Sequence, residues 1–277
     1  MVINFLYGSP TWLMGAAVLA AIIGFSTLGC VVSHRYLPHP LRKAHNDVVG
    51  LLFAPVSVFY AVLLALIAMS VWDTHDKAQN NVSREASLVG DLYRDTMTLP
   101  EPLRGEIATR LQDYVQVTLR EEWPAMAEGA AFGAAGWIQL RDVHARLSGY
   151  RPADPAAAVL LGETVRRLNT LYDARRDRIL AAQGRLPSMV WGVVILGMTL
   201  NIVFTFFLGM ESFKLHLFMI SAVAASIGLV VVLIVAFDHP FRGQLQVSPA
   251  AFVEVQQNIA AMTAGGQVRD PVAARHE

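Results

Sequence analysis

Histidine and carboxylate side chains gather at the ends of four long apolar stretches in this sequence. Imidazole together with carboxylate can bind a divalent metal or respond to pH. Their spacings match no metal signature, so we expect no metal site. One group precedes the second stretch and flanks the connection between the third and fourth, and the other follows the second and fourth stretches. The groups are His45, Asp47, Glu211 and His216, and Asp73, His75, Asp76, Asp238 and His239.

Signatures of the common enzyme classes are missing from the sequence. It contains no GxSxG, no HExxH, no glycine-rich phosphate loop and no paired-cysteine motif. Ser57 and Ser70 lie in an apolar stretch with no visible base beside them, and the single cysteine, Cys30, cannot form an intramolecular disulfide. We therefore expect no catalytic residues, no enzyme activity and no cofactor.

Two polar residues lie well inside the third apolar stretch. Asn201 and Thr205 are one helical turn apart, so they could bond across helices or touch a passing ion. No Asp, Glu, Lys, Arg or His lies well inside any of the four stretches. Pumps and coupled transporters usually need such a group at membrane depth, so this pattern favours a passive path.

The second stretch is the one that could line such a path. Val48 to Trp72 is 25 residues long without a charge, whereas roughly 20 apolar residues cross a bilayer. Side chains at about four-residue spacing offer two aromatic rings, a hydroxyl and an apolar run, which are the ingredients of a hydrophobic gate. An ordinary packing face between helices would show the same spacing. These pore-lining candidates are Phe53, Ser57, Tyr60, Leu64 and Ala68.

The amino end of that stretch could also matter for an ion. Free backbone N–H groups and the helix dipole make a helix start attractive to anions. Asn46 or Asp47 is expected to cap this helix, and a carboxylate there would compete with an incoming anion. His45, Asn46 and Asp47 are therefore helix-cap or pore-entrance candidates.

Composition places the chain in the class of membrane proteins. Of the 277 residues, 54% are hydrophobic and 16% are charged, which is too apolar for an ordinary soluble protein. Lys and Arg balance Asp and Glu at 22 each, so charge gives no argument for a nucleic-acid partner. We expect an all-α chain with transmembrane helices at about 11–33, 48–72, 189–210 and 215–237, the first of them retained in the mature protein.

The spans divide the chain into four parts. Residues 1–72 hold spans 1 and 2, residues 73–187 form a helical soluble insert continuous with span 2, residues 188–237 hold spans 3 and 4, and residues 238–277 form a short helix from Ser248-Pro249 and a mobile tail. In the insert, Pro124 is expected to end the helix that starts near Leu103. Its charged residues are expected on a solvated face, or in salt bridges between subunits: Arg84, Glu85, Glu121, Arg166, Arg167, Arg175 and Arg176.

Basic residues near the span ends predict the orientation. The side with the insert carries Lys77, Arg84, Arg175, Arg176, Arg178, Arg185 and Arg242, and the other side carries Arg35, Arg42, Lys43 and Lys214. Positive residues mark the cytoplasmic face, so the insert is expected in the cytoplasm of a bacterial inner membrane. Counting only short loops would point the other way, because long inserts translocate largely regardless of charge.

Several segments together resemble one family of membrane proteins. They are HNDVVG from His45, FAPVSVFYAVLLALIAMSVWD from Phe53, SREASLVGDLYRDTMTLPEP from Ser83, REEW from Arg120 and DHPFRGQLQVSPAAF from Asp238. This combination is similar to the bestrophin-like membrane protein family, and the resemblance covers about Leu41 to Phe252. The acidic calcium-clasp pattern of animal bestrophins is not among these segments.

The resemblance implies a fold and a function. Bestrophins are anion channels with four membrane helices, a cytosolic helical domain and a ring of identical subunits whose second membrane helices line the pore. By that resemblance we expect an oligomeric, passive anion channel whose partners are membrane lipid, further copies of the chain and a small inorganic anion. The alternative is a non-conducting membrane scaffold or sensor whose helical insert binds a protein partner.

Overall fold

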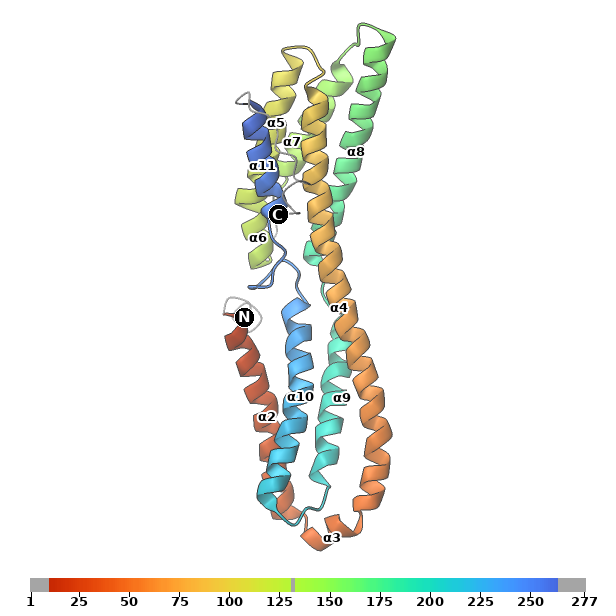
Figure 1. Cartoon of the computed structure of the whole chain (residues 1–277), viewed down its shortest axis with the longest axis vertical. Helices are drawn as coiled ribbons and strands as arrows, with labels where there is room; N and C mark the ends of the chain where they lie inside the picture. The colour runs from red at the N-terminus through yellow and green to blue at the C-terminus, as the bar shows by residue number, and fades with distance from the viewer. Residues whose placement is uncertain (1–9, 131–132, 264–277) are drawn as a thin grey trace, which may run out of the picture. The chain divides into compact units, whose positions relative to one another are not determined.

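The computed structural model describes residues 10–130 and 133–263, and every regular element in these ranges is a helix. The chain divides into two compact units. The membrane unit comprises described residues within 1–75, 184–239 and 243–245, and the helical unit comprises those within 76–183, 240–242 and 246–277. Helix α4, Asn46–Thr96, is continuous and contributes residues to both units (Figure 1).

The membrane unit contains α2 (Thr11–Tyr36), the short α3 (His39–Ala44), the first half of α4, α9 (Ser188–Phe206) and α10 (Phe213–Phe237) (Figure 1). Four helical stretches are long and apolar enough to cross a membrane, the third of them ending with α9. Helix α2 packs mainly on α10. The expected all-α architecture with two plus two spans is confirmed.

The helical unit is built around the second half of α4. It adds α5 (Leu103–Val117), the π-helix η1 (Thr118–Glu122), α6 (Trp123–Glu128), α7 (Ala135–Gly149), α8 (Pro155–Gln183) and α11 (Ala250–Thr263) (Figure 1). Leu92, Leu111, Leu140, Leu168 and Phe252 come from five of these helices and are all fully buried in one core. The expected C-terminal helix is present, whereas the expected mobile tail falls outside the described residues.

The prediction that Pro124 ends its helix is wrong. The chain continues from α5 through η1 into α6, where Pro124 occupies the first turn, and it stops at Gly129 with a φ of +67°. A proline ring clashes with the carbonyl four residues earlier in a regular α-helix. Here that carbonyl belongs to Arg120 in η1, whose wider turn relieves the clash.

The prediction of a solvated charged face is wrong for Glu85 and Arg175. Both are fully buried, as is Arg178, and Glu122 is 2% exposed. Arg178 donates to Glu85 at 2.6 Å and to Glu122 at 2.8 Å, while Arg175 donates twice to Glu122, at 2.5 and 3.0 Å. Two carboxylates and two guanidiniums from α4, η1 and α8 thus form one neutral cluster, which we call the buried ion cluster.

Aromatic groups complete the surroundings of the buried ion cluster. The Tyr114 hydroxyl donates to Glu85 and accepts from Arg175 at 3.3 Å. The Arg175 guanidinium lies over the Trp137 ring at 4.7 Å, a geometry in which the ring face attracts the cation. Burial raises the pKa of Tyr114 far above its usual range, so its hydroxyl stays protonated and available as a donor.

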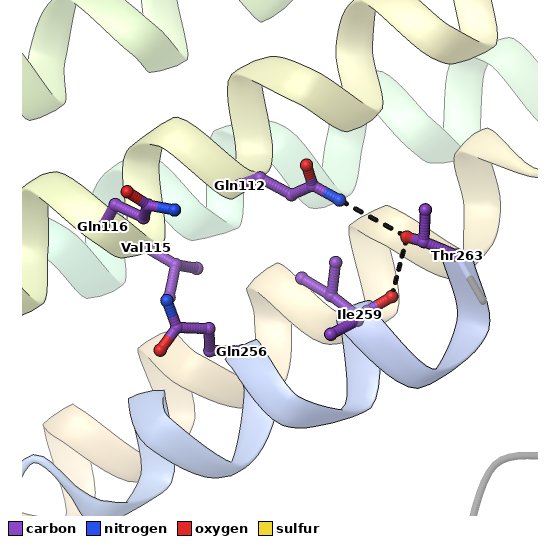
Figure 2. A pocket seen from close by; sticks show the side chains of 7 residues that line it. Gln112, Val115, Gln116, Gln256, Ile259 and Thr263 are labelled. Atoms are coloured by element: carbon purple, nitrogen blue, oxygen red, sulfur yellow. Dashed lines mark hydrogen bonds between the residues drawn. The ribbon is translucent and has the colours of Figure 1, made fainter.

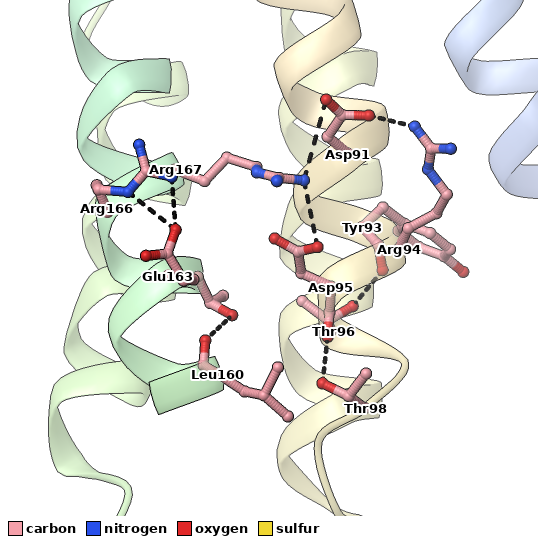
Figure 3. A network of polar contacts seen from close by, with 11 residues as sticks. Asp91, Tyr93, Arg94, Asp95, Thr96, Thr98, Leu160, Glu163, Arg166 and Arg167 are labelled. Carbon is pink, nitrogen blue, oxygen red and sulfur yellow. Dashed lines mark hydrogen bonds and ion pairs between the residues drawn. The ribbon is translucent and has the colours of Figure 1, made fainter. Parts of the chain in front are cut away.

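Four of the other charged residues named for the insert lie on its surface, and Arg167 is half-buried in salt bridges within the subunit. Arg84, Glu121, Arg166 and Arg176 are exposed. Figure 3 shows a surface network in which Arg166 pairs with Glu163 on α8, while Arg167 reaches across to two carboxylates of α4. Those are Asp95 at 3.2 Å and Asp91 at 3.9 Å. Exposed pairs of this kind contribute little stability.

Replacing Arg178 by methionine should strongly destabilise the helical unit. The change leaves Glu85 buried without its guanidinium, and breaking a buried ion pair from one side costs about 3–5 kcal/mol. Chemical unfolding of the full-length protein in detergent, followed by tryptophan fluorescence, measures the loss. Arg176→Met on the same helix is the matched control, because Arg176 pairs with Asp173 in solvent. Equal losses in the two variants would contradict the role of the buried ion cluster.

The contribution of Glu122 should depend on pH. Burial raises the pKa of Glu122, but the hydrogen bonds and charges of Arg175 and Arg178 lower it more, so the pKa is below its usual value. A carboxyl of this kind stabilises the fold above its unfolded pKa of about 4.3 and loses that contribution as pH falls through the folded pKa. The stability difference between wild type and Glu122→Gln should therefore be largest near neutral pH and shrink in acid.

Unfolding measured at a series of pH values checks this, with the exposed neighbour change Glu121→Gln as the control. A difference between wild type and Glu122→Gln that stays constant across the acidic range would speak against it.

Candidate functional site

The entrance to α4 is held by its neighbours in the membrane unit. The His45 carbonyl accepts from the Val49 N–H at 2.9 Å, so the helix cap is His45, one residue before the expected Asn46 or Asp47. The Asn46 side chain instead forms two hydrogen bonds with the α9–α10 connection. It accepts from the Gly209 N–H at 2.7 Å and donates to the Gly209 carbonyl at 3.0 Å. Asp47 is exposed in the first turn of α4, where it adds negative charge at the positive end of the helix dipole.

Helix α9 ends at Phe206 and not near residue 210 as expected, and two backbones approach closely in the connection that follows it. A methyl group at Gly209 would come within 2.4 Å of the Lys43 backbone nitrogen, so only glycine fits there. Beside this contact the Lys43 ammonium pairs with Glu211 at 2.8 Å on the surface. That hydrogen bond lowers the pKa of the Glu211 carboxyl. The connection is thus fixed against α3 and the start of α4.

The five pore-lining candidates lie on the side of α4 that faces its neighbours within the subunit. Tyr60 and Leu64 are buried, at 6% and 4% exposed, and the Tyr60 hydroxyl donates to the Val194 carbonyl of α9 at 2.9 Å. Phe53, Ser57 and Ala68 are half-buried, and the Phe53 ring centroid lies 6.1 Å from that of Phe204. These contacts attach α4 to α9.

Four of these candidates line a groove between α4, α9 and α10. It encloses about 580 Å³ and is bordered by Phe53, Ser57, Tyr60 and Leu64 from α4 and by Asn201 and Ser226 from the neighbouring helices. The Ser57 Oγ is buried there and has no hydrogen-bond partner in the described structure. Most of the wall is apolar, so the groove offers an ion only weak polar contacts.

The opposite face of α4 is left uncovered by the other residues that the structure describes. Its large apolar side chains are exposed, Phe59 to 77% and Leu51 to 75%. Such a face must meet lipid, another copy of the chain or an apolar path, because water does not solvate it favourably. The uncovered face comprises Leu51, Pro55, Phe59, Val62, Leu66 and Met69.

The intramembrane polar candidates bond within their own helix. Asn201 donates to the Gly197 carbonyl at 2.9 Å, and Thr205 donates to the Ile202 carbonyl at 2.5 Å. The Thr205 carbonyl also receives a hydrogen bond from His216 Nε2 at 3.1 Å. Asn201 alone borders the α4 groove, so the structure does not bring the two side chains to one site.

The histidine and carboxylate groups at the span ends do not converge as sets. His45 Nδ1 bonds the Leu41 carbonyl, and His75 Nε2 bonds the Leu245 carbonyl. Asp238 accepts from the Leu186 N–H at 2.7 Å and the Trp191 indole N–H at 3.2 Å. His216 lies instead beside Cys30 and His34. The sequence did not predict this grouping. No sequence spacing could have indicated it, because Cys30 and His216 are 186 positions apart.

The helical unit carries a second groove, between α5 and α11 (Figure 2). It encloses about 420 Å³, and Gln112 Nε2 donates across it to Thr263 Oγ1 at 3.4 Å. Amides and apolar groups make up its lining, without a charged side chain to attract an ion. The lining residues are Gln112, Val115, Gln116, Gln256, Ile259, Ala260 and Thr263.

Solved structures with the same fold include variants of a bacterial bestrophin homologue. A variant of a bacterial bestrophin homologue from Klebsiella pneumoniae is 12% identical, with a TM-score of 0.66 over 88% of this chain and 98% of that one. A second variant of that homologue is 14% identical, with a TM-score of 0.62 over 89% and 98%. A crystal structure described as a membrane protein is 13% identical, with a TM-score of 0.66 over 90% and 98%. At these identities the likeness shows the fold alone.

The sequence itself identifies the family. No curated protein matches the chain. A family model described as a Bestrophin-like domain matches residues 20–252, which include all four apolar helices except the first turns of α2. This range contains the segments that carried the resemblance. The chain is therefore an integral membrane protein that belongs to the Bestrophin-like domain family.

Proposed function

We propose that the protein is an oligomeric channel that conducts small anions passively, with α4 beside the permeation path. The observation that carries the proposal is the uncovered face of α4, which lies on the charge-free stretch from Val48 to Trp72 and keeps its large apolar side chains exposed in the described structure. A ring of copies that brought these faces together would shield them from water and leave an apolar constriction on the axis. Membership in the Bestrophin-like family supports the same arrangement.

Within this proposal the two sides of α4 have different roles. Tyr60 and Leu64 are covered by α9 and fix the helix. Ser57 and Phe53 border the α4 groove on the same side, where the Ser57 hydroxyl has no hydrogen-bond partner in the described structure. Phe59 and its neighbours on the uncovered face form the apolar constriction. The pore-lining role thus stays a prediction for Phe53, Ser57, Tyr60, Leu64 and Ala68, which lie on the covered side of α4.

A passive mechanism agrees with the charges along α4. From Val48 to Trp72 no group can carry a proton or a coupled ion. At the amino end of α4, the exposed Lys43 places a positive charge beside the first turn. Its ion pair with Glu211 partly neutralises that charge. An apolar path with weak polar contacts lets an ion enter and leave without being trapped.

We further propose that the chain resides in a bacterial inner membrane with the helical unit in the cytoplasm. The excess of basic residues near the span ends on that side supports this orientation. Arg175 and Arg178 are buried in the buried ion cluster, so they do not count among the basic residues exposed on the insert side. Arg42 is likewise buried on the other side. The insert side keeps its excess. Protease protection in intact and inverted membrane vesicles tests the orientation.

Purified protein reconstituted in a planar lipid bilayer should carry an anion-selective current. A chloride gradient should shift the reversal potential toward the chloride equilibrium potential, because the proposed path holds no fixed negative charge at depth. Bilayers containing detergent-extracted material without the protein are the control. A complete lack of current under all voltages and ions tried would favour the alternative, a non-conducting scaffold whose helical unit binds a protein partner.

Variants on the two sides of α4 should change that current to different extents. Phe59→Ala should raise the conductance several-fold, because it widens the apolar constriction. Ser57→Leu should change it much less, because Ser57 borders the α4 groove within the subunit and not the proposed axis. Leu196→Ala on α9 is the matched control, since Leu196 is another exposed apolar residue of the membrane unit, at 61%. If the control altered the conductance as much as Phe59→Ala did, the uncovered face of α4 would not line the path.

A further inference from the structure

Three metal-ligating side chains converge between α2 and α10 in the membrane unit. They are Cys30, His34 and His216, whose ligand atoms all lie within 4.8 Å of one another. In the part of the chain that the structure describes, no other set of three His, Cys, Asp or Glu side chains meets in this way. Cys30 is fully buried and His216 is 1% exposed, whereas His34 is half-buried and leaves one side open for entry.

His216 has the tautomer and direction that a metal ligand needs. Its Nε2 lies 3.1 Å from the Thr205 carbonyl oxygen, which can only accept, so Nε2 carries the hydrogen. The other ring nitrogen, Nδ1, therefore presents a lone pair, and it points at Cys30 Sγ at 3.8 Å. Metal-bound histidines typically donate their second N–H to a carbonyl or carboxylate in this manner.

The distance between sulfur and nitrogen suits a bound cation. Bonds of about 2.3 Å to sulfur and about 2.0–2.1 Å to nitrogen at a tetrahedral angle put the two ligand atoms about 3.5 Å apart. The observed 3.8 Å needs only a small adjustment. His34 lies one helical turn after Cys30, on the same face of α2, and its ring centroid is 5.3 Å from that of His216.

Arg42 sets the charge balance of this cluster. It is 3% exposed, its Nη1 donates to His34 Nδ1 at 3.1 Å, and its Nε has no hydrogen-bond partner in the described structure. The guanidinium offsets the negative charge of a Cys30 thiolate. Its hydrogen bond also occupies the single ring lone pair of a neutral His34, so a cation bound by His34 must displace that bond. A monovalent cation would leave one net positive charge in the cluster, and a divalent cation would leave two.

We propose that Cys30, His34 and His216 bind one thiophilic d10 cation, Zn²⁺ or Cu⁺, with the Cys30 thiolate and two imidazole nitrogens as ligands. Binding releases the thiol proton to solvent, and no electron is transferred. Thiolate and imidazole suit both cations. Three protein ligands complete a trigonal Cu⁺ site, whereas Zn²⁺ would take a water as its fourth ligand. The charge from Arg42 favours Cu⁺. Either cation would cross-link α2 to α10.

Metal binding by the purified full-length protein in detergent tests the site, independently of conduction. After treatment with a chelator, Co²⁺ serves as the spectroscopic probe for the Zn²⁺ arm, and Zn²⁺ should displace it. Under anaerobic conditions, competition with a chromophoric chelator measures Cu⁺. We expect one metal per chain, with a thiolate-to-cobalt charge-transfer absorption in the Co²⁺ arm and a higher melting temperature when metal is bound.

Three variants separate the site from adventitious binding. Cys30→Ser should abolish the charge-transfer band and weaken binding by more than the roughly 10–100-fold that loss of an outer-shell partner costs. His216→Gln should weaken binding too. His144→Gln, a histidine of the helical unit, is the control and should bind as wild type does. Cys30→Ser changes one atom, and its melting temperature without metal verifies that it folds.

Two outcomes would overturn the proposal. One is a wild-type protein that binds neither Cu⁺ nor Co²⁺ at one per chain. The other is binding and thermal stabilisation that survive Cys30→Ser. In both cases the contact between Cys30 and His216 would be a buried thiol–imidazole hydrogen bond only.

Discussion

The helical unit depends on the pairing of two carboxylates with two guanidiniums in a place that water does not reach. Glu85 comes from α4, Glu122 from η1, and Arg175 and Arg178 from α8. A charge left alone in such an environment is very costly, so these three segments must meet in one register. A one-turn slip of α8 along α4 would break the pair of Arg178 with Glu85 and the pair of Arg175 with Glu122. The apolar core supplies most of the free energy of folding, but it would tolerate sliding more readily than the buried ion cluster does.

The helical architecture follows from patterns that are local in the sequence. Long charge-free runs predicted the membrane helices, and apolar residues at three- and four-residue spacing predicted the helices of the insert. Local patterns failed where the outcome depends on a distant partner. Arg84 and Glu85 are adjacent charged residues on the same helix, yet Arg84 is exposed and Glu85 is buried, because only Glu85 faces Arg178, 93 positions further along the chain. Pro124 failed as a stop signal for a related reason, since the π-helix that accommodates it has no sequence rule of its own.

For α4 the spacing of residues predicted a face but could not say what the face meets. Phe53, Ser57, Tyr60 and Leu64 do share one side, and the structure puts α9 and α10 against it. A stripe at four-residue intervals is equally suited to a neighbouring helix and to an aqueous path. The Tyr60 hydroxyl is the feature that separates the two, because a buried donor needs a partner and finds it in the Val194 carbonyl. What distinguishes the other side of α4 is the absence of any such partner for its large apolar groups among the described residues.

Polar residues in the segments that resemble the bestrophin-like family form hydrogen bonds and ion pairs that hold helices together. Asn46 in HNDVVG is bonded to Gly209, Glu122 in REEW to two guanidiniums, and Asp238 in DHPFRG to the Leu186 N–H and the Trp191 indole. Each bond fixes a junction between helices, and each engages the group that could otherwise have contacted an ion. The polar motifs therefore predict the fold more strongly than they predict permeation. In the proposed channel, an anion would meet what these bonds leave available, which in the membrane unit is mainly the uncovered face of α4.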